Sequence, residues 1–234
     1  MCFSATASFA STALLVPLGI SALWRSWRNG RTDLGPLALM PVGFGLQQAM
    51  EGALWLELRR GPLEPEPHGA ALAYLFFALA FWPIWIPTVA LSLAVAGPPC
   101  WRVGRQRRRL LQALQALGVL LGVGLWLPLL LQPARVDPTV VQGSIDYGLT
   151  LLLSGEMAGS VRYLYAGLIS VPLLLLPSGR LRAFGLALVA SGLIADWAYH
   201  HVFLSVWCYL SALLSLLVVG LVWSEPADSR RPSS

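Results

Sequence analysis

The sequence of 234 residues contains no lysine and little charge of either sign. Its sixteen basic residues are all arginine, and 12% of its residues are charged, against about 25% in an average soluble domain. The absence of lysine excludes Schiff-base chemistry on a lysine side chain, including the attachment of retinal. The scarcity of charge, together with a hydrophobic content of 56%, excludes a soluble globular domain and indicates an integral membrane protein.

Cysteine is also scarce, with only Cys2, Cys100 and Cys208 in the chain. No Cys-x-x-Cys spacing occurs, so a zinc ribbon is not expected. No basic residue precedes the first apolar stretch, which is the reverse of a secretory signal peptide. We therefore expect this stretch to be an uncleaved first span with its N-terminus outside.

The apolar runs predict an all-α fold, a bundle of seven transmembrane helices that form one domain over residues 1–223. A membrane-spanning helix needs about 20 apolar residues, and the block from Ala183 to Trp223 is long enough for two. Residues 132–160 are mixed in composition and are expected to form a short helix against the bundle. The polar residues 224–234 predict a disordered cytoplasmic tail. The seven expected spans are residues 9–25, 34–58, 70–96, 110–131, 161–176, 183–201 and 203–223.

The third expected span contains Pro83 and Pro87, which predict a kink. This motif, Phe81-Trp82-Pro83-Ile84-Trp85-Ile86-Pro87, is more typical of packing than of a cofactor site.

The arginines predict the orientation, because positively charged residues favour the cytoplasmic side of a membrane. Four fall on one side of the expected bundle, at Arg59, Arg60, Arg135 and Arg162, and the other twelve on the opposite side. This asymmetry places the N-terminus outside and the C-terminus inside. It also accounts for the basic charge without a nucleic-acid partner, and the lipid bilayer is the expected partner. The twelve are Arg25, Arg28, Arg31, Arg102, Arg105, Arg107, Arg108, Arg109, Arg180, Arg182, Arg230 and Arg231.

The second expected span carries Gln47, Gln48 and Glu51, and Trp55 continues the same helix face. Ionisable residues within spans are costly and usually face the bundle interior or a wet cavity. We therefore predict an outward-facing polar pocket in which Glu51 is a proton carrier, a general base or a metal ligand. The alternative is a carboxyl group that is satisfied by the two glutamines and fixes helix packing.

Cys2 and Cys208 are predicted to lie near this pocket. Removal of the initiator methionine would leave Cys2 as an N-terminal residue whose amine and thiol form a chelate or a nucleophile. The two cysteines could instead form a disulfide in an oxidising periplasm, or be unrelated. Cys208 also belongs to a stripe of small polar residues, and such stripes commonly let helices approach closely.

Asp196 and His200 are four residues apart on one helix face, so the aspartate can share a metal with the histidine or orient its ring. A site of this kind needs a third ligand from another helix. The simpler interpretation is that both side chains are hydrated at a helix end.

Several motifs together resemble a bacterial family of uncharacterised integral membrane proteins. They are the opening Met1-Cys2-Phe3-Ser4-Ala5, Gln47-Gln48-x-x-Glu51-Gly52 with Trp55, the proline motif of residues 81–87, and Ser205-Val206-Trp207-Cys208. The resemblance implies a multi-pass location in the bacterial inner (plasma) membrane and implies no established activity. It supports one site containing Cys2, Gln47, Gln48, Glu51, Trp207 and Cys208.

Asp196-x-x-x-His200 also resembles part of the zinc site of seven-helix membrane hydrolases of the alkaline ceramidase type. The paired histidines on the last helix and the histidine on the second helix of those enzymes have no counterpart here.

These observations lead to a ranked hypothesis. The first is thiol redox chemistry or metal handling, with Cys2, Glu51 and Cys208 as catalytic groups. Gln47, Gln48, Trp55 and Trp207 would bind the substrate, and Cys2, Glu51, Cys208, Asp196 and His200 would hold a transition metal. The second is a proton-coupled transporter of a small solute or ion that uses Glu51, and the third is a non-catalytic assembly subunit.

Overall fold

The computed structural model describes residues 4–60, 69–149, 156–199 and 202–226. This part of the chain is 83% helical. It forms seven continuous helical segments, which we call rods: α1, α2–α3, α4–α5, α6, α7, α8 and α9–α10. Its helices and strands are α1 (Ala5–Arg28), α2 (Gly35–Ala38), α3 (Met40–Arg59), α4 (Gly69–Leu75), α5 (Trp82–Ala96), α6 (Arg105–Leu131), β1 (Thr139–Val141), β2 (Ser144–Asp146), α7 (Glu156–Leu174), α8 (Gly179–Ala198), α9 (Phe203–Leu214) and α10 (Leu216–Ser224). Short 3-10 turns occupy Thr32–Leu34, Pro99–Trp101 and Pro133–Arg135.

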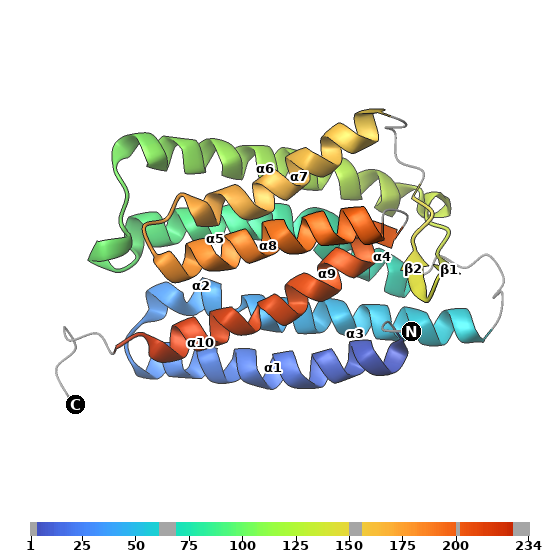
Figure 1. Cartoon of the computed structure of the whole chain (residues 1–234), viewed down its shortest axis with the longest axis horizontal. Helices are drawn as coiled ribbons and strands as arrows, with labels where there is room; N and C mark the ends of the chain where they lie inside the picture. The colour runs from blue at the N-terminus through green and yellow to red at the C-terminus, as the bar shows by residue number, and fades with distance from the viewer. Residues whose placement is uncertain (1–3, 61–68, 150–155, 200–201, 227–234) are drawn as a thin grey trace.

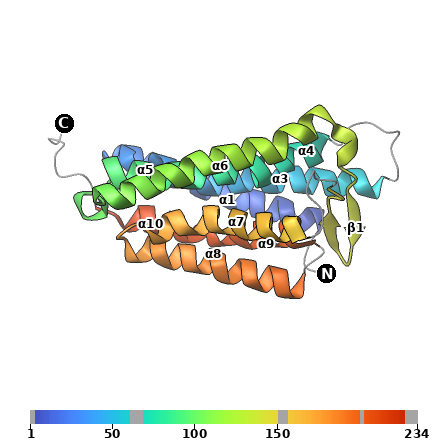
Figure 2. The same cartoon turned by 90° about the horizontal axis from the view of Figure 1, so that it is seen from above.

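The long helices run side by side along one axis (Figures 1 and 2). One end of the bundle, which we call the arginine-rich end, collects the end of α1 and the starts of α6 and α8. The described arginines there are Arg25, Arg28, Arg31, Arg102, Arg105, Arg107, Arg108, Arg109, Arg180 and Arg182. The opposite end carries the β1–β2 hairpin and is called the hairpin end (Figure 1).

Five helices of the described part are long and apolar enough to cross a membrane, by length and composition. They are Ala5–Arg28, Gly69–Ala96, Arg105–Leu131, Gly179–Ala198 and Phe203–Ser224. Helix α3 is not among them, and it buries the polar side chains of Gln47, Gln48 and Glu51. Long helices with exposed apolar faces are stable in lipid and unfavourable in water. The composition of these five helices therefore indicates a multi-pass membrane protein.

The rod that contains Pro83 and Pro87 has a π-helical turn at Phe76–Phe81, directly before α5. The N–H of Trp82 donates to the carbonyl of Phe77, five residues back. In this register the next bond would run from Pro83 to Ala78, but proline has no N–H. The hydroxyl of Tyr165 on α7 donates to the Ala78 carbonyl instead. The π-turn is the local feature of the region where the sequence predicts a kink.

We expect Tyr165→Phe to lower the free energy of unfolding by about 1–3 kcal/mol, because it leaves the buried Ala78 carbonyl without its donor. Thermal melting in detergent measures this change. The matched control is Tyr163→Phe on the same helix, because Tyr163 is 67% exposed and should tolerate the change. Equal melting of the two variants would contradict the proposed role of the Tyr165 hydroxyl.

Helix α6 packs closely against this irregular rod. Pro87 removes the N–H that would bond to the Pro83 carbonyl, and Gly118 lies against that free oxygen. A Cβ atom at Gly118 would be 2.1 Å from the Pro83 carbonyl oxygen, and one at Gly122 would be 3.0 Å from the Ala80 carbonyl oxygen. The Gly-x-x-x-Gly spacing on α6 thus permits close backbone approach, as in other membrane helix pairs.

The prediction of a short helix within residues 132–160 is wrong for Thr139–Asp146, which forms an antiparallel hairpin. Val140 and Val141 favour a strand. Gln142 and Gly143 have positive φ values of 51° and 78°, the conformation of a two-residue type I′ turn. Residues 150–155 lie outside the described part.

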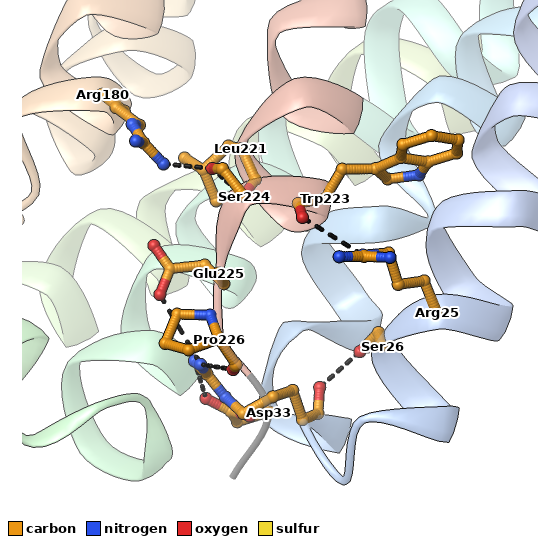
Figure 3. Close-up of polar contacts among 10 residues, drawn as sticks. Arg25, Ser26, Asp33, Arg180, Leu221, Trp223, Ser224, Glu225 and Pro226 are labelled. Carbon is orange, nitrogen blue, oxygen red and sulfur yellow. Dashed lines mark hydrogen bonds and ion pairs between the residues drawn. The ribbon is translucent and has the colours of Figure 1, made fainter.

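The tail expected from Ser224 onward is held against the bundle through Pro226, and residues 227–234 lie outside the described part. Arg31 donates from Nε and Nη2 to both carboxylate oxygens of Asp33, each at 3.1 Å. Its Nη1 donates to the Pro226 carbonyl at 3.3 Å and lies 3.6 Å from Oε2 of Glu225 (Figure 3). Burial lowers the pKa of Arg31, but Asp33 and Glu225 outweigh it and raise that pKa above its ordinary value.

Two further arginines hold the end of α10 at the same place (Figure 3). Arg25 on α1 donates to the Trp223 carbonyl at 3.1 Å, and Arg180 on α8 donates to the Ser224 hydroxyl. Several arginines of this end therefore bind the protein's own backbone and side chains, in addition to any effect on topology.

Candidate functional site

Glu51 on α3 is the centre of a buried polar cluster. Its side chain is 2% exposed, and one carboxylate oxygen accepts a hydrogen bond from the Ser205 hydroxyl of α9 at 2.5 Å. Gln48 lies beside the same carboxyl group. No arginine of the described residues pairs with Glu51, and the three histidines of the chain lie outside the described part. The carboxyl group therefore lies in the bundle interior without a cationic partner from the described part of the chain.

The two glutamines are fully buried one turn before Glu51. The Gln47 side-chain oxygen accepts from the indole N–H of Trp82 at 2.7 Å, which fixes the amide, and Trp82 stacks on Phe44. The Gln47 nitrogen and both polar atoms of Gln48 make no hydrogen bond of standard geometry to the described residues, although Gln47 lies beside the Cys208 thiol and Gln48 beside the Glu51 carboxyl group. Buried polar groups are nearly always paired, so three atoms beside Glu51 are available to a ligand or to water.

The hairpin end of the cluster is closed by two tyrosines. Tyr74 of α4 and Tyr147, which follows β2, stack with ring centroids 4.7 Å apart. Both are buried, and neither hydroxyl makes a hydrogen bond of standard distance and angle to the described residues. The hairpin thereby places a phenol from a distant part of the chain at the site.

Cys208 lies one turn after Ser205 on α9 and belongs to the same cluster. It is a free thiol, 5% exposed, beside the Tyr74 hydroxyl and the Gln47 amide. We call the set of Gln47, Gln48, Glu51, Tyr74, Tyr147, Ser205 and Cys208 the Glu51 cluster. It combines one carboxyl, one thiol, two phenols, two amides and one hydroxyl in the hairpin-end half of the bundle.

The two tryptophans that the sequence assigns to substrate binding differ in position: Trp55 packs against members of the Glu51 cluster, whereas Trp207 does not face it. Trp55 is buried in the apolar cluster that contains Tyr74, Cys208 and Leu54. Trp207 lies on another face of α9, where its indole N–H donates to the Leu188 carbonyl at 3.1 Å and is 3.2 Å from the Ser191 hydroxyl. Adjacent residues of a helix point about 100° apart, so Trp207 faces α8 while Cys208 faces the Glu51 cluster.

Of the remaining candidates, only Asp196 lies in the described part, and it pairs with an arginine. Asp196 accepts from Arg162 of α7 at 2.5 Å, and Arg162 also lies over the Phe203 ring. His200 and Cys2 lie outside the described residues. Within the described residues no group of three histidine, cysteine or acidic side chains has the proximity needed for a metal ion.

Sequence reasoning missed three members of the cluster. In the sequence, Ser205 belongs to a small-residue stripe and opens the motif Ser205-Val206-Trp207-Cys208, but neither assigns it to the site, and Tyr147 belongs to a segment of mixed composition. Tyr74 gives no local signal, because a single tyrosine in an apolar span is typical of packing.

The fold and the cluster define an α-helical multi-pass membrane protein with a buried, ionisable polar site. The chain belongs to a family of unknown function, DUF6629, whose model matches residues 1–233. No curated protein and no solved structure matches the chain.

Proposed function

We propose that this protein is a membrane carrier that binds a proton at Glu51 and couples it to the movement of a small polar solute. The observation that carries the proposal is the burial of Glu51 without a cationic partner in the described part of the chain, beside amide and phenol groups that lack hydrogen bonds of standard geometry to the described residues. An isolated charge is costly in such a place. The neutral acid, or the carboxylate with a bound cation, is the form that the site holds at low cost.

The surrounding groups suit a polar solute. Gln48 offers two amide donors and one acceptor, Gln47 offers the amide nitrogen, and Tyr74 and Tyr147 offer hydroxyls. Ionisable residues in membrane helices commonly mark ion or substrate pathways. The π-turn beside α5 is a further feature that often occurs at functional sites.

The proposed orientation follows from the arginines. With the arginine-rich end in the cytoplasm, the N-terminus and the hairpin lie outside, and the Glu51 cluster lies in the outer half of an inner (plasma) membrane. The β1–β2 hairpin, which carries Tyr147 to the cluster, then lies on the outer side of the membrane.

A second candidate is thiol redox chemistry or metal handling, and it is favoured by Cys208, which lies in the same cluster as Glu51. These two residues supply one thiol and one carboxylate, so a metal site would require further ligands such as Cys2 from outside the described part. We rank this function second because the described cluster holds one thiol, whereas it holds several unpaired groups that suit a polar solute. A non-catalytic assembly role is third.

We expect Glu51→Gln to reduce solute-driven proton uptake into proteoliposomes to background, because the amide cannot carry a proton. The assay follows a pH-sensitive dye inside the vesicles while amino acids, carboxylates and sugars are added singly outside. The control is Glu57→Gln on the same helix, outside the cluster, which should retain the flux.

Three outcomes separate the candidates. Retained flux in Glu51→Gln would refute the carrier mechanism. Absence of flux with every solute in the wild-type protein, together with a bound metal that Cys208→Ser loses, would favour the second candidate. If neither substitution changes flux or metal content, that result would favour the non-catalytic assembly role. Folded protein should persist in Glu51→Gln, because the Gln side-chain oxygen still accepts from Ser205.

A further inference from the structure

An open groove lies between α5 and α6 near the arginine-rich end, separate from the Glu51 cluster. Its volume is about 290 Å³. Its polar side chains are Thr88 and Ser92 of α5 and Arg108, Gln112 and Gln115 of α6. The groove therefore combines a cation with amides and hydroxyls on a membrane-facing part of the bundle.

The apolar part of the groove comes from α5, where Leu91 and Val95 line it. Arg108, Gln112 and Gln115 follow at spacings of four and three, so they share one face of α6. Gln115 donates to the Thr88 hydroxyl at 3.3 Å, which closes the deep end. Gln112 and Arg108 are exposed. This agrees with the position of α6 as the least buried of the five candidate spans.

The positive charge at the start of α6 is electrostatically unfavourable. Arg105, Arg107, Arg108 and Arg109 occupy its first turns with no acidic residue there. Cations at a helix N-terminus are unfavourable, and like charges four residues apart repel each other. None of the four forms an ion pair with the described residues. An anion at this position would remove the repulsion.

Other arginines at the same end differ. Arg25, Arg31 and Arg180 are used in contacts with the end of α10 and the residues after it (Figure 3), and Arg182 donates to the Leu176 carbonyl at 2.9 Å. Four arginines without an ion pair to the described residues therefore lie together at the start of α6, beside the groove.

We propose that this groove binds one anionic phospholipid of the bilayer. The phosphate pairs with Arg108, and the neighbouring arginines add positive potential. Gln112 donates to the glycerol ester region, and an acyl chain lies along Leu91 and Val95. The groove thus offers a cation for the phosphate, amide and hydroxyl groups for the polar linkage, and apolar side chains of α5 for an acyl chain.

The test is native mass spectrometry of the detergent-purified protein titrated with phosphatidylglycerol or phosphatidylcholine of identical chains. We expect tighter binding of phosphatidylglycerol, and Arg108→Gln to weaken it about fivefold. Arg107→Gln, with the same charge change one residue away and not lining the groove, should weaken it less than about twofold. Ala96→Trp fills the groove without changing charge and should also remove the bound lipid.

Equal losses in Arg107→Gln and Arg108→Gln would overturn the proposal, because they would indicate diffuse charge attraction. Equal affinity for the two lipids would overturn it as well. If inorganic phosphate displaces phosphatidylglycerol while Ala96→Trp still binds it, the site recognises phosphate alone and the lipid assignment is wrong. Unchanged melting temperatures of the three variants establish that the binding losses do not reflect unfolding.

Discussion

Gly118→Leu is expected to prevent accumulation of the folded protein. Even the first side-chain atom would lie 2.1 Å from the Pro83 carbonyl oxygen, so α6 must move away from the α5 rod. The contact is with backbone rather than with a flexible side chain, and the cost should be about 3 kcal/mol or more. Fluorescence-detected size-exclusion chromatography of the solubilised membranes measures the folded fraction.

The same helix supplies the control. A Cβ atom at Gly124 would have no neighbour within 4 Å, so Gly124→Leu adds an apolar side chain without a clash and should accumulate normally. Gly122→Ala should be intermediate, because its Cβ would lie 3.0 Å from the Ala80 carbonyl oxygen. If Gly118→Leu and Gly124→Leu behave alike, the close approach of α6 at the Pro83 carbonyl does not exist.

Trp207→Ala is the second substitution with a large expected effect. The indole is 2% exposed, lies against Gly192 of α8 and donates to the Leu188 carbonyl. Truncation of a buried tryptophan typically costs about 3–5 kcal/mol, so we expect a large drop in melting temperature. Trp197→Ala is the matched control, because Trp197 is 89% exposed on α8 and should leave melting nearly unchanged.

Trp207→Phe separates packing from ligand binding. It retains an aromatic ring but loses the N–H donor, so we expect a loss of about 1–3 kcal/mol and no change in the solute dependence of proton uptake. A variant of normal stability with altered solute affinity would instead support the substrate-binding role that the sequence suggested for Trp207.

Local sequence information accounts for much of the fold. The apolar runs predicted the helices because burial in lipid depends on the composition of each segment by itself. The shared face of Gln47, Gln48 and Glu51 was predictable because helix geometry relates residues three and four apart. The hairpin at Thr139–Asp146 was missed, although Gln142-Gly143 between short β-favouring residues is compatible with a turn.

The composition of the candidate site depended on contacts between distant segments. Glu51 meets Ser205, 154 residues away, and Tyr147 reaches Tyr74 through the hairpin. Asp196 pairs with Arg162 rather than with a described metal-ligand group. Sequence spacing does not show which helices are neighbours or how each helix is rotated about its axis. These two properties decide which residues of different helices come into contact.

By itself, then, the sequence determined a helical membrane protein with a polar face on α3, because hydropathy and helical periodicity are local properties. Only the tertiary structure decided that Cys208 faces Glu51 while Trp207 faces α8, and that Gly118 contacts the carbonyl freed by Pro87. The physical reason is that close packing fixes the rotation and offset of each helix against its neighbours, and these contacts join residues far apart in the chain.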